Sequence, residues 1–220
     1  KPQGFIILAA CDPVYLREHA KAFLTSCIRH GNDVHLHLID PSDDDIVEAY
    51  SYKASIEAMN WNKNKITFTA EHGYAPVTAE ARRVYYACNR FMVAHELMFE
   101  DTDIEEVFIS DVDSLIMNHV YAPKENLGLF LREPLPGTVG WENEGTRVAA
   151  GAVFVRNEAW GFLDAVVDII GKELKSSSTR WFIDQAALSK VHQTGTYDPI
   201  RVYDNQFMDW EFESGTTIWT

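Results

Sequence analysis

The sequence predicts an α/β fold in a single domain covering residues 1–220, with a central sheet and helical crossovers. Short apolar runs alternate with longer amphipathic segments through the amino-terminal half, which is the pattern of strands joined by helices. A chain of 220 residues lies within the size range of one domain and can bury a full core. We find no internal repeat, low-complexity tract or compositional break that marks a second domain.

The first strand is expected over 5–10, where the residues Phe-Ile-Ile-Leu-Ala-Ala are all apolar. Asp12 and Pro13 then predict a helix start, because Asp is a favoured N-cap and Pro fits the first helical position. Apolar residues at helical spacing continue this helix to about residue 28, and Gly31 ends it.

A second strand is expected over 34–38, because apolar residues alternate there with His35 and His37. The two histidines share one face of the strand. We interpret them as the exposed polar face of a half-buried strand rather than as metal ligands.

The remaining elements follow from caps and apolar periodicity. Ser42 and Asp45 match a capping box for a helix to about residue 59, and Thr78 caps a long helix to about residue 99. Asn157 is expected to cap another helix. Further strands are expected over 65–69, 106–110, 127–131 and 152–155, and a last helix over 181–192. The tail from Tyr197 is expected to be irregular.

The charge balance excludes several classes of partner. Lys and Arg number 19 against 33 Asp and Glu, which gives a net charge of −14 at pH 7. Such a chain repels both a nucleic-acid backbone and an anionic lipid surface. Its longest apolar run, 5–11, is too short to span a bilayer. We therefore expect no nucleic-acid partner and no membrane segment in this chain.

The cysteines favour a reducing, cytoplasmic compartment. Cys11, Cys27 and Cys88 are odd in number and lack CxxC spacing, so neither a disulfide framework nor a zinc knuckle is indicated. The chain begins at Lys1 rather than Met, so we expect a processed piece. The question whether an anchor or signal was removed from it stays open.

The candidate functional residues of this sequence are mainly carboxylates. The dinucleotide, P-loop, zinc-protease and serine-hydrolase signatures are all missing from the sequence. Asp-x-Asp pairs occur at 43/45, 101/103 and 111/113. The first pair lies in the first turn of an expected helix, where acids interact favourably with the helix dipole, and the second lies in a polar loop.

The third pair, Asp111 and Asp113, lies where ligands bind in α/β sheets. It directly follows the apolar strand residues 107–109, which places it at the carboxyl end of a buried strand. Residues i and i+2 of an extended chain point the same way, so both carboxylates can bind one hard cation such as Mg²⁺ or Mn²⁺. Substrate phosphates typically fill the open positions of such a cation.

Four segments in order resemble a known enzyme family. They are Arg90-Phe91 on a helix, Val107-Phe-Ile-Ser-Asp111-Val-Asp113-Ser-Leu115, Ala150-Gly151-Ala-Val-Phe-Val155, and Asp184-Gln185 with Leu188. Their order and spacing over residues 5–192 resemble a GT-A fold glycosyltransferase, in particular the glycogenin-like and galactosyltransferase-like enzymes of family 8. The resemblance implies a Rossmann-like domain with a mixed, mostly parallel central sheet, and retention of the anomeric configuration.

The resemblance also implies a role for each matching residue. Asp111 and Asp113 would hold Mn²⁺ or Mg²⁺ against the diphosphate of a nucleotide sugar, a UDP-sugar being favoured. Asp184 and Gln185 match the catalytic pair beside the donor sugar and the reacting centre. The residues matched to nucleotide-sugar binding are Ala9, Ala10, Cys11, Asp12, Tyr15 (on the base), Arg90 (near the phosphates), Asp111, Val112, Glu133 (near the sugar hydroxyls), Ala150 and Gly151.

The sequence departs from the family pattern in two places. Ala149 and Ala150 precede Gly151 where the family usually has Asn, so one sugar contact is lost or supplied elsewhere. The late His that serves the family as a third metal ligand has no counterpart, because the last His is His192. Since the chain stops at Thr220, we expect a carboxyl-terminal segment to be missing.

Taken one at a time, the same residues also have structural explanations. A helical Arg90 pairs with Glu96 or Asp101, and Asp12 acts as an N-cap. Three tryptophans are interpreted as core residues rather than sugar platforms: Trp141, Trp181 and Trp210.

The leading hypothesis is an enzyme, a metal-dependent hexosyltransferase that moves a sugar from a nucleotide-diphosphate sugar to an unknown acceptor. A nucleotidyltransferase on the same fold is one alternative, although the segment 9–13 lacks the Gly-rich, basic loop typical of that class. A non-catalytic nucleotide-sugar-binding module is the other. The released product distinguishes them: nucleoside diphosphate, pyrophosphate or none.

Overall fold

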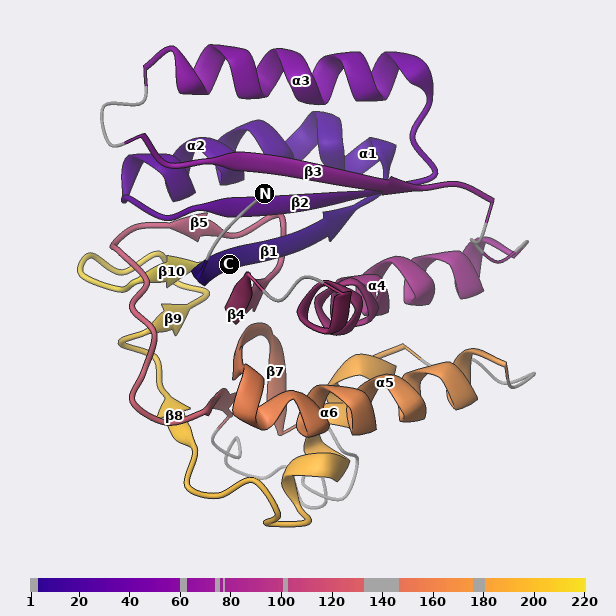
Figure 1. Cartoon of the computed structure of the whole chain (residues 1–220), viewed down its shortest axis with the longest axis vertical. Helices are drawn as coiled ribbons and strands as arrows, with labels where there is room; N and C mark the ends of the chain where they lie inside the picture. The colour runs from indigo at the N-terminus through magenta and orange to yellow at the C-terminus, as the bar shows by residue number, and fades with distance from the viewer. Residues whose placement is uncertain are drawn as a thin grey trace.

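The chain folds around a seven-stranded mixed sheet with helices on both faces (Figure 1). The computed structural model describes residues 4–59, 63–73, 76, 78–100, 103–132, 147–175 and 181–220. The strands are β1 (Gly4–Cys11), β2 (Val34–Ile39), β3 (Ile66–Glu71), β4 (Ile104–Ser110), β6 (Leu127–Leu131), β7 (Val148–Arg156) and β8 (Arg201–Tyr203). They lie side by side in the order β3-β2-β1-β4-β7-β6-β8.

The strand directions confirm the predicted fold class. Neighbouring strands are parallel from β3 through β2 and β1 to β4. β7 runs antiparallel to both β4 and β6, and β8 is parallel to β6. The sheet is therefore mixed and mostly parallel. Because β1 and β4 are parallel neighbours, their carboxyl ends meet at the same end of the sheet.

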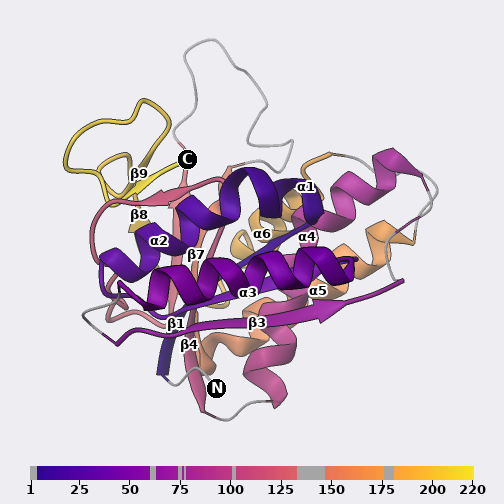
Figure 2. The same ribbon diagram turned by 90° about the horizontal axis from the view of Figure 1, so that it is seen from above.

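Helices cover both faces of this sheet. They are α1 (Pro13–Tyr15), the π-helical turn η1 (Leu16–Ala20), α2 (Lys21–Arg29), α3 (Asp43–Glu57), α4 (Ala79–Glu100), the 3₁₀ turn η2 (Asn157–Ala159), α5 (Trp160–Leu174) and α6 (Ile183–His192). α2 and α3 lie side by side over one face (Figures 1 and 2), and α4, α5 and α6 pack together on the other. No helix in the described ranges is both long enough and apolar enough for a membrane crossing.

The core forms on both faces of the sheet because successive side chains of β1 point to opposite faces. Ile6 and Leu8 pack on the side of α4, α5 and α6, whereas Ile7 and Ala9 pack on the side of α2 and α3. All four side chains are fully buried. A strand that is apolar at successive positions is typical of a sheet covered on both faces.

The predicted helix ends are confirmed at several caps. The Asp12 carboxylate accepts a hydrogen bond from the Tyr15 backbone N–H at 2.9 Å, so Asp12 caps the first helix. Ser42 and Asp45 form the capping box of α3. Gly31 follows α2 with φ of 80°, a left-handed conformation that costs glycine little.

Two helix starts differ from the prediction. Asn157 does not cap a helix but begins the short turn η2, with Arg156 at the N-cap position. The last helix begins at Ile183 rather than at residue 181, because Phe182 adopts a left-handed conformation with φ of 68°.

The carboxyl-terminal tail is more regular than predicted. β9 (Met208–Asp209) and β10 (Ile218–Trp219) form a second sheet with β5 (Leu115–Ile116), in the order β5-β10-β9. Strands of two residues are too short to show alternation in a sequence. By pairing with β5, the tail therefore holds in place the chain segment just after Asp113.

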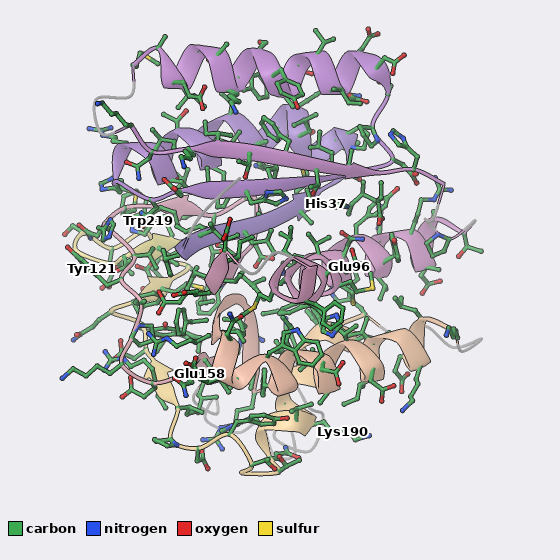
Figure 3. All side chains as sticks on the ribbon, in the orientation of Figure 1. His37, Glu96, Tyr121, Glu158, Lys190 and Trp219 are labelled. Carbon is green, nitrogen blue, oxygen red and sulfur yellow. The ribbon has the colours of Figure 1, made fainter. Side chains whose placement is uncertain are left out.

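His35 and His37 are buried, which corrects their interpretation as an exposed polar face. Both ring nitrogens of His35 lie 2.8 Å from the hydroxyls of Thr67 and Thr69 on β3, and His37 lies 2.8 Å from Thr69. Glu71 faces His37 and accepts hydrogen bonds from side chains of α4, so His37 lies between the sheet and α4 (Figure 3). Burial lowers the pKa of His35 to about 4.

Candidate functional site

A cleft of about 740 Å³ lies where β1 and β4 end. Its volume is in the range of pockets that hold small molecules, and its position is where open α/β sheets bind ligands. It brings together predicted residues from widely separated parts of the chain, namely Ala10, Cys11, Asp12, Tyr15, Arg90, Asp111, Val112, Asp113, Ala150, Gly151, Asp184 and Gln185.

One predicted residue lies elsewhere. Ala9 is fully buried against the α2 and α3 side of the sheet, because its side chain points to the opposite face from that of Ala10. Glu133 and Trp141 lie outside the described residues.

Asp111 and Asp113 form the acidic end of the cleft, directly after β4. Burial and the negative charge of Asp111 raise the pKa of Asp113. The pKa of the nearby Tyr15 hydroxyl is also raised, by burial and then by the charges of Asp113, Asp12 and Asp111. Three acidic side chains thus concentrate negative charge here, which favours a bound cation.

Arg90 links two acidic parts of the cleft. Its Nη2 lies 3.0 Å from Asp111 Oδ1 and 3.1 Å from Asp184 Oδ2, and Nη1 donates to the Ala87 carbonyl at 2.7 Å. The side chain is only 8% exposed. Although burial opposes its charge, the carboxylates of Asp111 and Asp184 hold the pKa of Arg90 above its ordinary value. Arg90 thus pairs across the fold and not with Glu96 of its own helix.

Asp184 and Gln185 lie in the first turn of α6 and are both buried. Asp184 Oδ1 accepts a hydrogen bond from the Gln185 backbone N–H at 2.8 Å, while Oδ2 accepts from Arg90. Burial raises the pKa of Asp184, and the charge of Arg90 opposes that rise. Two fixed partners therefore hold this carboxylate in one orientation at the cleft wall.

Gly151 allows β7 to pass close to Asp111. A Cβ added at Gly151 would lie 2.5 Å from Asp111 Oδ2, which is too short for any non-bonded contact. Ser110 and Ala152 are paired across β4 and β7, so Gly151 lies next to the point where β4 ends. A residue without a side chain is needed here because the carboxylate occupies that space.

Two arginines that were not predicted from the sequence also line the cleft. Arg132 follows β6, and its Nη1 donates to Gln185 Oε1 at 3.0 Å. A single arginine after a short strand carries no sequence signal. Arg83 precedes Arg90 by seven residues on α4, and this spacing, two helical turns, is the signal that could have found it.

Two tryptophans that were interpreted as core residues are exposed. Trp181 and Trp210 are 56% and 46% exposed, and both line the cleft. Trp181 precedes α6, and Trp210 follows β9. Neither position lies in an amphipathic helix or strand, so hydrophobicity alone gave no information about burial.

The residues present fit a divalent cation whose coordination a ligand completes. In the part of the chain that the structure describes, no three His, Cys, Asp or Glu side chains form a metal-binding group. Mg²⁺, however, is commonly bound through one or two carboxylates together with substrate phosphates. Asp111 and Asp113 are two such carboxylates, and burial together with the charge of Asp111 raises the pKa of Asp113.

No protein-family model matches the sequence, and no curated protein matches it either.

Proposed function

We propose that the protein is a glycosyltransferase that moves a hexosyl group from a nucleotide-diphosphate sugar, first of all a UDP-sugar, to an acceptor with Mn²⁺ or Mg²⁺ bound. One observation carries the proposal. The Arg90 guanidinium lies between Asp111, at the acidic end of the cleft, and Asp184, at the start of α6. A cation-binding carboxylate, a phosphate-binding guanidinium and a fixed carboxylate for the sugar thus share one cleft. The resemblance to GT-A enzymes adds support by analogy.

The leaving group is the first chemical problem that this reaction poses. Asp111 and Asp113 would hold the cation, which supplies charge stabilisation to the leaving diphosphate. Arg90 adds a fixed positive charge near the same phosphates, where it need not reorganise during the reaction. Tyr15, which is 44% exposed, offers its ring to the nucleotide base.

The sugar is the second problem. Asp184 stabilises positive charge as it develops at the anomeric carbon, and Gln185 holds a sugar hydroxyl. The bond from the anomeric carbon to the diphosphate oxygen breaks, and the acceptor oxygen forms a new bond to that carbon. The acceptor proton passes to the departing diphosphate, as a retaining reaction allows.

Calorimetric titration of UDP with and without Mn²⁺ tests the site. We expect Mn²⁺ to tighten UDP binding at least about tenfold, and Asp113→Asn to abolish this gain while leaving the fold intact, because the residue contributes little to the core. Asp43→Asn is the matched control, since Asp43 belongs to another Asp-x-Asp pair and its own side chain is exposed at the start of α3. Equal Mn²⁺ dependence in wild type and Asp113→Asn would remove the metal assignment.

The released product then tests the reaction. Incubation with UDP-sugars and Mn²⁺ is expected to release UDP. Pyrophosphate would instead indicate nucleotidyl transfer, and tight binding without any product would indicate a binding module. Either of those results rejects the proposed glycosyl transfer.

A further inference from the structure

A second guanidinium, that of Arg132, lies in the cleft in a different electrostatic setting from Arg90. Arg132 follows β6 (Leu127–Leu131) and is half-buried. Its Nη1 donates to Gln185 Oε1 at 3.0 Å, and its Cζ lies 5.6 Å from the centre of the Trp210 ring. An amide and an aromatic face thus fix the position of the guanidinium.

No acid among the described residues forms an ion pair with Arg132. Arg90 has two carboxylates within 3.1 Å, whereas Arg132 has no ion pair with any described residue, and its contacts are to neutral groups. Burial lowers the pKa of Arg132 by more than the charges of Asp184 and Asp111 raise it. A half-buried guanidinium of this kind is stabilised when a ligand brings a negative charge.

Arg132 and Arg90 contact different residues of the cleft. Arg90 contacts both Asp111 and Asp184, and so lies between the acidic end of the cleft and α6. Arg132 contacts Gln185, the neighbour of Asp184 in α6, and among the described residues it forms no ion pair with Asp111. Resting on the proposed function, this places Arg132 beside the sugar rather than beside the phosphates.

We propose that Arg132 binds the carboxylate of an acidic sugar, so that one substrate of the enzyme is a hexuronate. The planar fork of an arginine pairs with both oxygens of a carboxylate, which neutral hexoses lack. The carboxylate belongs either to the donor sugar or to the acceptor. In both cases the guanidinium pairs with a sugar carboxylate, and the two arms of the experiment distinguish the donor from the acceptor.

The donor arm compares UDP, UDP-glucose, UDP-glucuronate, UDP-galactose and UDP-galacturonate by titration calorimetry with Mn²⁺. If the donor carries the carboxylate, one uronate binds at least about tenfold more tightly than its neutral partner. The acceptor arm titrates glucuronate, galacturonate, glucose and galactose into protein saturated with UDP and Mn²⁺. If the acceptor carries it, one free uronate binds at least about tenfold more tightly than the matching hexose.

Variants connect the preference to Arg132. Arg132→Met keeps the length and apolar stem of the side chain, and is expected to remove the preference while UDP alone binds as before. Arg132→Lys keeps the positive charge but lacks the planar fork, so it is expected to retain only part of the preference for the uronate. It replaces Arg132→Met as the test if the methionine variant does not fold. Arg147→Gln is the control, because the Arg147 side chain is exposed and lies outside the cleft lining. The two arginines lie next to each other, since the Arg147 backbone carbonyl accepts a hydrogen bond from the Arg132 backbone N–H at 2.9 Å.

The outcomes separate this inference from the proposed function. A failure of UDP to bind overturns both. Binding of UDP without a uronate preference in either arm overturns only the inference about Arg132. A preference that survives in Arg132→Met, or that is lost in Arg147→Gln, overturns the assignment to this residue.

Discussion

Replacing Gly151 with Ala is expected to damage the site while sparing the fold. The added Cβ would lie 2.5 Å from Asp111 Oδ2, whereas ordinary van der Waals contact begins at 3.4 Å, so the carboxylate must retreat by roughly 0.9 Å. The obstacle is the end of a side chain and not backbone, so we expect a stability cost of only about 1 kcal/mol. Misplacing a binding group by about 1 Å can lower turnover about a hundredfold.

The assay measures Mn²⁺-linked UDP binding by calorimetry and stability by urea unfolding. We expect Gly151→Ala to lose at least about tenfold in Mn²⁺-linked UDP affinity. Gly171→Ala is the matched control, because a Cβ at Gly171 in α5 meets nothing within 4 Å. It is expected to stabilise the helix by about 1 kcal/mol and to leave UDP binding unchanged. A folded Gly151→Ala protein with undiminished Mn²⁺-linked binding would refute the reasoning.

Three further predictions concern charged groups. Asp184→Asn keeps the shape of the side chain and removes its charge, so UDP release is expected to fall about a hundredfold while UDP affinity stays within a few-fold; near-normal release would reduce Asp184 to a structural acid. Arg90→Lys cannot span Asp111, Asp184 and the Ala87 carbonyl together, so urea unfolding is expected to show a loss of about 2 kcal/mol, and unchanged stability would contradict the contact network. The pKa of His35 is about 4 in the folded chain against 6.5 ordinarily, so its neutral form stabilises the fold above pH 6.5 and about 3 kcal/mol is lost as the pH falls to 4. Relative to wild type, His35→Gln should gain that amount between pH 7 and pH 4, and parallel stability curves would disprove it.

The carboxylate pair could be predicted because its information is local. An apolar strand followed at once by Asp111 and Asp113 indicates where the strand ends, and the end of β4 at Ser110 agrees with it. The N-cap Asp12 and the capping box of Ser42 and Asp45 are local in the same way. Each of these features depends on a few successive residues, so each can be predicted from a short stretch of sequence.

The centre of the candidate site could not be predicted from spacing. Arg90 and Asp184 are 94 residues apart, and they meet because α4, α5 and α6 pack on the same face of the sheet. Arg132 reaches Gln185 across 53 residues for the same kind of reason. The resemblance to a family named Arg90, Asp184 and Gln185, but Arg132 belongs to no quoted motif and was missed.

The burial of His35 and His37 shows a related limit. Alternation predicts that one face of a strand is polar, but it does not say what lies against that face. Here the threonines of β3 hydrogen-bond to the two rings, and α4 covers the same face through side chains that bond to Glu71. A polar face that finds partners can be as buried as an apolar one.

The pairing of β5 with β10 has a consequence for how the protein is made. The hydroxyl of Ser114, next to Asp113, donates a hydrogen bond to the hydroxyl of Thr220, 106 residues later in the chain. A ribosome adds about 5–20 residues per second, so Asp113 leaves it about 5–20 s before the segment that fastens its loop. The described strands of the seven-stranded sheet all lie at or before Tyr203. A newly synthesised chain can therefore form this sheet first, and its acidic cleft becomes fully anchored only when β10 has been made.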